Sequence, residues 1–183
     1  PRGSEVWRRL VQDDSLTRRL FWVSSGCLVL FWLSLIRAFG ATPAEDALIL
    51  FRYSEHLAHG QGIAWNPGEG PVEGATDFLW MVLVSALTRM IGDPVLSALL
   101  LGGACVVATL CLLYWFFRRH LRLPFIVFAV AALCYLATPI FVHLVNGFSP
   151  PIFGFALLAS TVLFALVLER PGDFPTLLGW AMA

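Results

Sequence analysis

Residues 94–117 read PVLSALLLGGACVVATLCLLYWFF, a run of 24 residues without a charged side chain. About 20 such residues in an α-helix are enough to cross the hydrocarbon core of a bilayer. Similar apolar runs cover Leu20–Phe39, Pro124–Val145 and Pro151–Leu168. The sequence therefore predicts an all-α fold, a polytopic bundle of membrane-spanning helices.

The composition supports a membrane protein. Of the 183 residues, 58% are hydrophobic and only 13% are charged, and the mean hydropathy is +0.79, far outside the range of soluble domains. The formal net charge is zero, so we expect the lipid bilayer and no nucleic acid as a partner. The four cysteines lie inside apolar runs without metal-site spacing, which indicates packing residues.

The positions of arginine predict the orientation. The first span follows a segment that carries Arg8, Arg9, Arg18 and Arg19, which places the N-terminus in the cytoplasm. Phe78–Ile91 has 14 residues, too few for a crossing, and we expect it to lie at the membrane surface. The three arginines between 118 and 122 then lie on the cytoplasmic side of the membrane. This topology puts Gly40–Ile91 and Asn146–Pro150 on the same extracytoplasmic face, where they can form one site.

The chain is predicted to hold one domain. Residues 1–4 read PRGS and look like the remnant of a protease-site tag, so they are set aside. Residues 5–183 contain no repeat and no linker. The last apolar segment, Phe174–Ala183, is about half as long as a crossing, so we expect 5–183 to be the N-terminal part of a longer membrane domain.

A polar segment after the first span predicts an amphipathic helix next to the membrane. Thr42-Pro43-Ala44-Glu45 has the form of a capping box, with Thr42 as N-cap and Glu45 reaching back to it, and Gly60 is placed to end the helix. Asp46 projects toward the apolar side of this helix, where an unused carboxylate is costly. A partly buried carboxylate suits a general base, so Asp46 is the preferred catalytic candidate and Glu45 is mainly a cap.

Other polar residues of the segment have competing interpretations. Arg52 either pairs with Glu55 or His56 on the solvated face, or binds a phosphate with its guanidinium. His56 and His59 are more typical of surface residues than of metal ligands. Asn66–Glu69 predicts a type II turn, and the flanking Trp65 and Trp80 fit an interfacial aromatic belt. Thr76 or Asp77 can cap the next helix, whereas Glu73 has no such structural role.

Seven short motifs between residues 45 and 80 carry a resemblance to a known family. They are Glu45-Asp46-Ala47, Phe51-Arg52-Tyr53, Leu57-Ala58, Gly60-Gln61-Gly62, Asn66-Pro67-Gly68-Glu69, Val72-Glu73-Gly74 and Thr76-Asp77-Phe78-Leu79-Trp80. Together they resemble the first extracytoplasmic loop of bacterial GT-C glycosyltransferases. Within that family, the motifs are similar to those of arabinofuranosyltransferases with a decaprenyl-phosphate arabinose donor and of related uncharacterised membrane transferases.

The resemblance implies a GT-C fold and a set of site residues. In that family the acidic pair after the first span carries catalysis, which points to Asp46 with Glu45 beside it. Five further residues are then expected to bind the donor phosphate or the substrate: Arg52, Tyr53, Asn66, Glu73 and Thr76. Relatives often have a Gly-Leu-Glu-Thr sequence where this chain has Asn146–Pro150. Ser149 replaces that glutamate, so no role for it carries over, and the arabinose-specific assignment is weaker.

The resulting functional hypothesis is an inverting-type glycosyltransferase of the bacterial inner membrane. It would move a sugar, such as arabinofuranose, from a polyprenyl phosphate to a glycan or protein acceptor outside the cytoplasm. Asp46 would act as general base. The sequence indicates no particular cofactor; a divalent metal is compatible with this chemistry, but no motif demands one. The alternatives are a transporter or flippase of a lipid-linked or small polar substrate, and a structural subunit without chemistry of its own.

Overall fold

The computed structural model describes residues 14–39, 43–71 and 77–169, and all regular structure within these ranges is helical. The elements are α2 (Asp14–Phe39), α3 (Glu45–Ala58), α4 (Phe78–Ile91), α5 (Pro94–Tyr114), the π-helical turn η1 (Trp115–His120), α6 (Phe125–Ala137), α7 (Ile140–Val145) and α8 (Pro150–Glu169). The described residues contain no strand, which confirms the all-α prediction. The predicted tag remnant, residues 1–4, lies outside the described residues.

Among the described residues, three helical stretches are long and apolar enough to cross a membrane: Ser15–Leu35, Pro94–His120 and Pro150–Glu169. They correspond to three of the four predicted spans. The 14-residue α4 is too short by this criterion, as the sequence predicted. These helices support a membrane-embedded protein.

The fourth predicted span, Pro124–Val145, is wrong as one continuous helix. It is divided into α6 and α7 at Thr138–Pro139. Proline lacks an N–H donor and disfavours helical geometry in the residue before it, and Thr138 accordingly has an extended backbone with ψ of 161°. The Thr138 hydroxyl donates to the Tyr135 carbonyl at 2.6 Å, which satisfies an acceptor at the end of α6.

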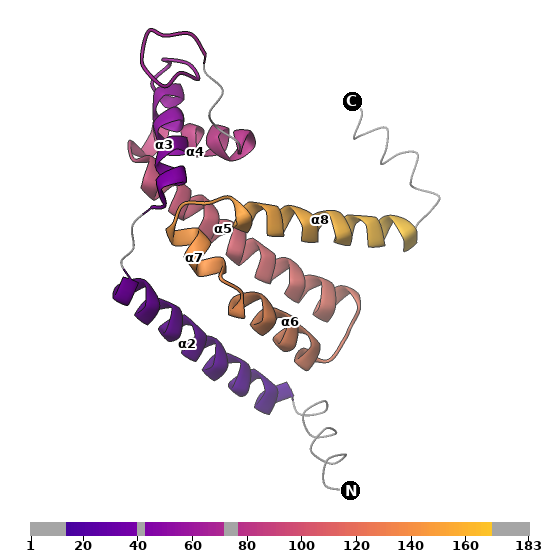
Figure 1. Cartoon of the computed structure of the whole chain (residues 1–183). Helices are drawn as coiled ribbons and strands as arrows, with labels where there is room; N and C mark the ends of the chain where they lie inside the picture. Colours follow the sequence, from indigo (N-terminus) through magenta and orange to yellow (C-terminus); the bar gives the residue numbers. More distant parts are fainter. Residues whose placement is uncertain (1–13, 40–42, 72–76, 170–183) are drawn as a thin grey trace, which may run out of the picture.

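The helices form two packed groups (Figure 1). In one group Phe21 of α2 contacts the rings of Phe125 and Phe128 of α6, with centroid distances of 5.6 and 5.4 Å. In the other group α3 and α4 pack together over the start of α5, around the fully buried Met81 and Val84. The second group, with the loops beside it, carries most of the described acidic residues, so it positions the candidate site.

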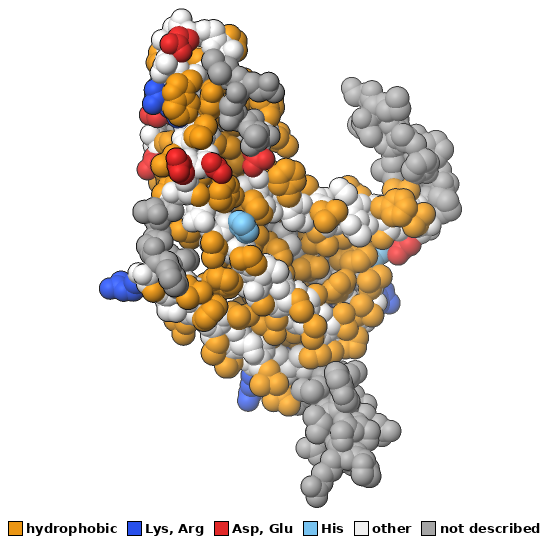
Figure 2. All heavy atoms as spheres, in the orientation of Figure 1, with side chains coloured by type: hydrophobic (Ala, Val, Ile, Leu, Met, Phe, Trp, Pro, Cys, Tyr) orange, Lys and Arg blue, Asp and Glu red, His pale blue; other side chains and the backbone are white. Residues whose placement is uncertain are grey.

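Apolar and acidic side chains occupy different parts of the surface. Figure 2 shows a largely hydrophobic surface over the long helices and acidic side chains gathered over α3 and α4. On α8, Leu157 is 71% exposed and Phe153 is 63% exposed. Such a large exposed apolar surface is unusual for a protein in water and suits contact with lipid.

Candidate functional site

The start of α3 differs from the predicted capping box. The helix begins at Glu45, with the extended residue Ala44 as N-cap and no side-chain capping hydrogen bond. Glu45 is therefore the first helical residue and not the third, and Thr42 lies outside the described residues. The Ala44 N–H instead donates to the Asn146 carbonyl at 3.3 Å. A tertiary contact thus fixes the start of the helix, and sequence spacing could not reveal it.

The end of α3 follows the prediction for Gly60. The N–H of Gln61 donates to the His56 carbonyl at 2.9 Å, and the N–H of Gly60 donates to the Leu57 carbonyl at 3.1 Å. This is a Schellman motif, and Gly60 has the left-handed φ of +76° that it requires.

Replacing Gly60 by Ala is expected to lower the free energy of unfolding by about 1 kcal/mol, because a side chain disfavours the left-handed conformation. Denaturant unfolding of the detergent-solubilised protein measures this change. Gly70→Ala is the matched control, because Gly70 has no positive φ and no atom within contact of the added Cβ. Equal effects of the two substitutions would contradict a conformational cause.

The apolar face predicted for α3 is confirmed, but it covers protein and not a membrane surface. Its buried residues are Ala47, Leu50, Phe51, Tyr53, Ser54 and Ala58. The Ser54 hydroxyl lies within 2.9 Å of the Leu50 carbonyl and 3.1 Å of the Met81 carbonyl, which joins α3 to α4. Tyr53 is only 2% exposed and packs 5.8 Å from the Trp65 ring. Tyr53 therefore supports the site from below its surface.

Both carboxylates of the acidic pair lie at the surface. Glu45 and Asp46 are exposed, so the expectation that Asp46 is partly buried on the apolar side is wrong. Asp46 is exposed because it lies in the first turn of α3, before the buried side chains that pack against α4. The positive end of the helix dipole favours carboxylates at this position.

Arg52 binds the loop that follows α3. Its Nε donates to the Trp65 carbonyl at 2.8 Å, and its Nη2 donates to Asn66 Oδ1 at 3.3 Å. The guanidinium also lies 4.6 Å from the centroid of the Trp65 ring, a cation–π contact. Pairing with Glu55 or His56 is absent among the described residues. Arg52 thus organises the loop and keeps an exposed edge of its guanidinium.

The loop itself has the predicted turn. The Glu69 N–H donates to the Asn66 carbonyl at 3.2 Å, and Gly68 has a φ of +89°, as a type II turn needs. The Asn66 side chain donates to Glu69 Oε2 at 3.0 Å. His56 Nδ1 lies 2.7 Å from the Ala64 carbonyl, so this histidine fastens the loop to α3 and is not a free surface residue.

Removing the Arg52 side chain is expected to release this loop. In Arg52→Ala, amide hydrogen exchange of Glu69, whose N–H donates to the Asn66 carbonyl, should accelerate about tenfold, because the two hydrogen bonds and the cation–π contact that hold the loop are lost. Arg52→Lys keeps the charge but cannot reproduce the paired Nε and Nη2 geometry, so it should recover only part of the protection. Arg89→Ala is the control, because the Arg89 side chain is exposed and makes no hydrogen bond with a described residue. Unchanged exchange in Arg52→Ala would refute this role.

A shallow groove of about 690 Å³ lies beside this arginine. Its lining residues are Glu45, Leu48, Ile49, Phe51, Arg52, Glu55, Trp65, Pro94 and Val95. The groove therefore combines a cation, two carboxylates and an aromatic ring that is 38% exposed. Hydrogen-bonding groups beside an aromatic surface can hold a polar ligand such as a sugar or a phosphate. Asp46 is not among the lining residues, whereas Glu45 is.

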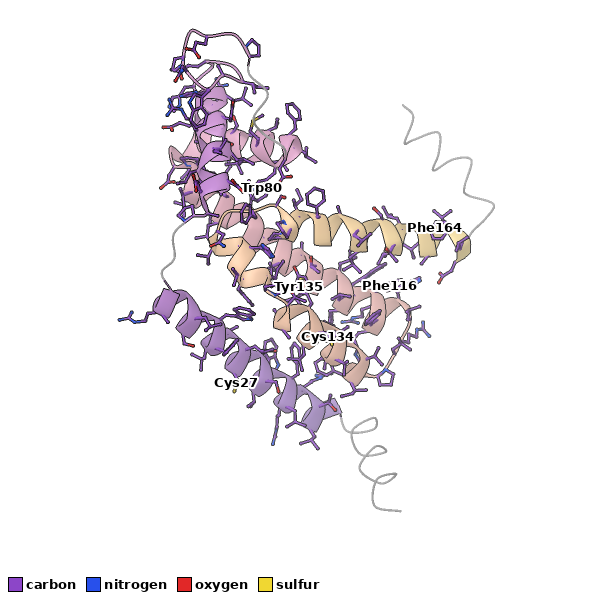
Figure 3. All side chains as sticks on the ribbon, viewed as in Figure 1. Cys27, Trp80, Phe116, Cys134, Tyr135 and Phe164 are labelled. Atoms are coloured by element: carbon purple, nitrogen blue, oxygen red, sulfur yellow. The ribbon has the colours of Figure 1, made fainter. Side chains whose placement is uncertain are left out.

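The segment between α7 and α8 contacts both α4 and the residue that precedes α3, which is compatible with the predicted single site. The Trp80 Nε1 donates to the Gly147 carbonyl at 3.0 Å, and the Ser149 hydroxyl donates to Asp77 Oδ2 at 2.5 Å. Figure 3 shows Trp80 at this junction. Trp80 is only 2% exposed, so its assignment to an interfacial aromatic belt is wrong. Burial of a tryptophan needs a hydrogen-bond partner, and here a distant carbonyl supplies it.

The structure brings some of the predicted site residues together, and two others lie outside the part of the chain that it describes. Glu45, Arg52, Tyr53 and Asn66 lie close to one groove, and Asp46 lies in the same turn as Glu45. Glu73 and Thr76 lie outside the described residues. Within the described ranges no three His, Cys, Asp or Glu side chains are grouped to hold a metal ion. Sequence reasoning missed the Asp77–Ser149 contact, because the two residues are 72 positions apart.

In comparisons with known proteins, no protein-family model, no curated protein and no solved structure matches this chain.

Proposed function

We propose that this chain is the membrane part of a glycosyltransferase that moves a sugar from a polyprenyl phosphate to an acceptor hydroxyl. The proposal is supported by one observation above all. A groove with a cation and two carboxylates lies at the polar end of a group of apolar helices. Helix α3 supplies these charged groups, and it also carries the exposed Asp46. A lipid-linked donor has this same division, with an apolar chain and an anionic sugar phosphate.

The chemistry assigned to the site needs few groups. Asp46 accepts the proton of the acceptor hydroxyl as the oxygen attacks the anomeric carbon of the donor. The bond from that carbon to the lipid phosphate oxygen breaks, and the phosphate leaves with the electron pair. Arg52 offsets the charge of this phosphate through the edge of its guanidinium that no described residue occupies. Because a lipid phosphate is a good leaving group, a general acid is unnecessary.

The proposed location of this enzyme is the bacterial cell envelope. The groove would face the extracytoplasmic side of the bacterial inner membrane, and the arginines between 118 and 122 would face the cytoplasm. The acceptor would be a glycan or a protein. Arabinofuranose is the sugar that the motif resemblance favours, although Ser149 departs from the arabinose-specific pattern.

Loss of the gene tests the proposal in cells. Mass spectrometry of the lipid extract should reveal a polyprenyl-phosphate sugar that accumulates in the deletion strain and disappears when the intact gene is restored. The mass of its head group identifies the sugar. An unchanged lipid extract would contradict the proposal.

A flippase would produce the same accumulation, so the rival function needs a separate observation. Transporters commonly place charged residues or broken helices at mid-membrane. In α5 and α8 the only charged residue is Glu169, at the last position of α8. The break between α6 and α7 is the one described feature that a transporter would share. Transfer in detergent, where no compartments exist, separates the two functions.

A further inference from the structure

A second pocket, of about 180 Å³, lies between the start of α4 and the start of α8. Six of its lining residues are apolar: Phe78, Leu79, Trp80, Ile152, Phe153 and Ala156. Its two polar lining residues are Asp77 and Ser149. It shares no lining residue with the groove beside Arg52, so it is a separate site.

The apolar wall of this pocket continues into the surface that lipid would cover. Phe78, Leu79 and Phe153 are 59%, 65% and 63% exposed, and the next turn of α8 presents Leu157, which is 71% exposed. Because α8 is one of the stretches able to cross a membrane, a hydrocarbon chain can reach the pocket from the bilayer. The volume is below the ~300 Å³ typical of sites that hold a whole small ligand, so it fits one segment of a chain.

The polar end of the pocket is anionic. Ser149 is only 3% exposed, and its hydroxyl donates to Asp77 Oδ2. Oδ1 of Asp77 accepts no hydrogen bond from any described residue, and the described lining residues include no arginine and no histidine. A carboxylate in this setting attracts a hydroxyl donor and repels a phosphate.

We infer that this pocket binds an amphiphile with an uncharged, hydroxyl-bearing head group. The hydrocarbon chain lies against Phe153 and Ala156, and a hydroxyl of the head group donates to Asp77. Only the role of this ligand, as a lipid-borne glycan acceptor whose hydrocarbon chain is anchored apart from that of the donor, rests on the proposed function. The binding itself does not depend on catalysis.

Photolabelling of the complete gene product in nanodiscs tests the inference. The probes are an alkyl glucoside and an alkyl phosphate with the same diazirine-bearing chain. The glucoside should label residues 152–156, as mapped by mass spectrometry, and the phosphate should label them less. Ala156→Trp fills the pocket and should reduce glucoside labelling about tenfold. Leu163→Trp, about two turns further along the exposed side of α8, is the control and should leave labelling unchanged.

The head-group specificity has its own test. Asp77→Asn preserves the shape of the side chain but removes its charge. The ratio of glucoside labelling to phosphate labelling should therefore fall. Equal labelling of wild type and Ala156→Trp, or stronger labelling by the phosphate in the wild type, would overturn the inference. Labelling as expected in a protein without sugar transfer would refute the proposed function alone, whereas transfer without labelling would refute only this pocket.

Discussion

Replacing Asp46 by Asn in the complete gene product is expected to lower the rate constant of sugar transfer by about 10²–10⁴-fold, the usual contribution of a general base. The carboxamide has the same size but cannot take the proton of the acceptor hydroxyl. Since Asp46 is exposed, the substitution should change the free energy of unfolding by less than about 0.5 kcal/mol. Transfer of labelled sugar from a lipid-linked donor and the melting temperature together measure these effects.

Glu45→Gln is the matched control for this substitution. Glu45 is also exposed and lies one residue away, but it lines the groove together with Arg52. We expect a loss of about tenfold or less, arising from weaker binding of substrate hydroxyls. A large loss in Glu45→Gln with near wild-type activity in Asp46→Asn would reject Asp46 as the base and transfer that role to Glu45.

Replacing Gly147 by Ala is expected to produce the largest loss of stability, about 2–4 kcal/mol. Gly147 has a φ of +82°, which disfavours any side chain. An added Cβ would lie 2.4 Å from Cζ of Phe51, and Phe51 cannot yield easily because it is 3% exposed. The substitution should also weaken the hydrogen bond from Trp80 Nε1 to the Gly147 carbonyl. The segment between α7 and α8 would then pack less well against both α3 and α4.

Thermal unfolding in detergent measures the effect of Gly147→Ala. Gly103→Ala is the control, because Gly103 lies within α5 and an added Cβ there meets no atom within 4 Å. The double substitution Gly147→Ala with Phe51→Leu should be less destabilising than the sum of the two single ones, since the smaller side chain relieves the clash. Additive losses would show that Phe51 is not the cause.

The sequence predicted the features that depend on local chemistry. The apolar runs predicted the long helices, Gly60 predicted the end of α3, and Asn66–Glu69 predicted the turn, because each signal resides in adjacent residues. Arginine counting predicted that the first loop and Asn146–Pro150 share one face, where they can form one site. The Trp80–Gly147 hydrogen bond shows that the two segments are in contact, whereas their side of the membrane stays a prediction.

The errors share a different physical origin. The cap of α3, the burial of Trp80 and the pairing of Asp77 with Ser149 depend on contacts between residues far apart in the chain. Helical periodicity likewise assigned Asp46 to an apolar side, but periodicity does not say how far along α3 the packing against α4 extends. The break at Pro139 was readable from the sequence, since proline in a helix interior removes a hydrogen bond.

The central claim, that this chain belongs to a transferase and not to a transporter, is tested most directly in detergent micelles. The complete gene product is incubated with a polyprenyl-phosphate sugar and a hydroxyl-bearing acceptor, and mass spectrometry follows the free polyprenyl phosphate and the glycosylated acceptor. We predict that both products form in equal amounts without any membrane gradient, and that Asp46→Asn slows their formation by about 10²–10⁴-fold. Intact donor after incubation with a folded protein, together with donor movement across a reconstituted bilayer, would contradict it.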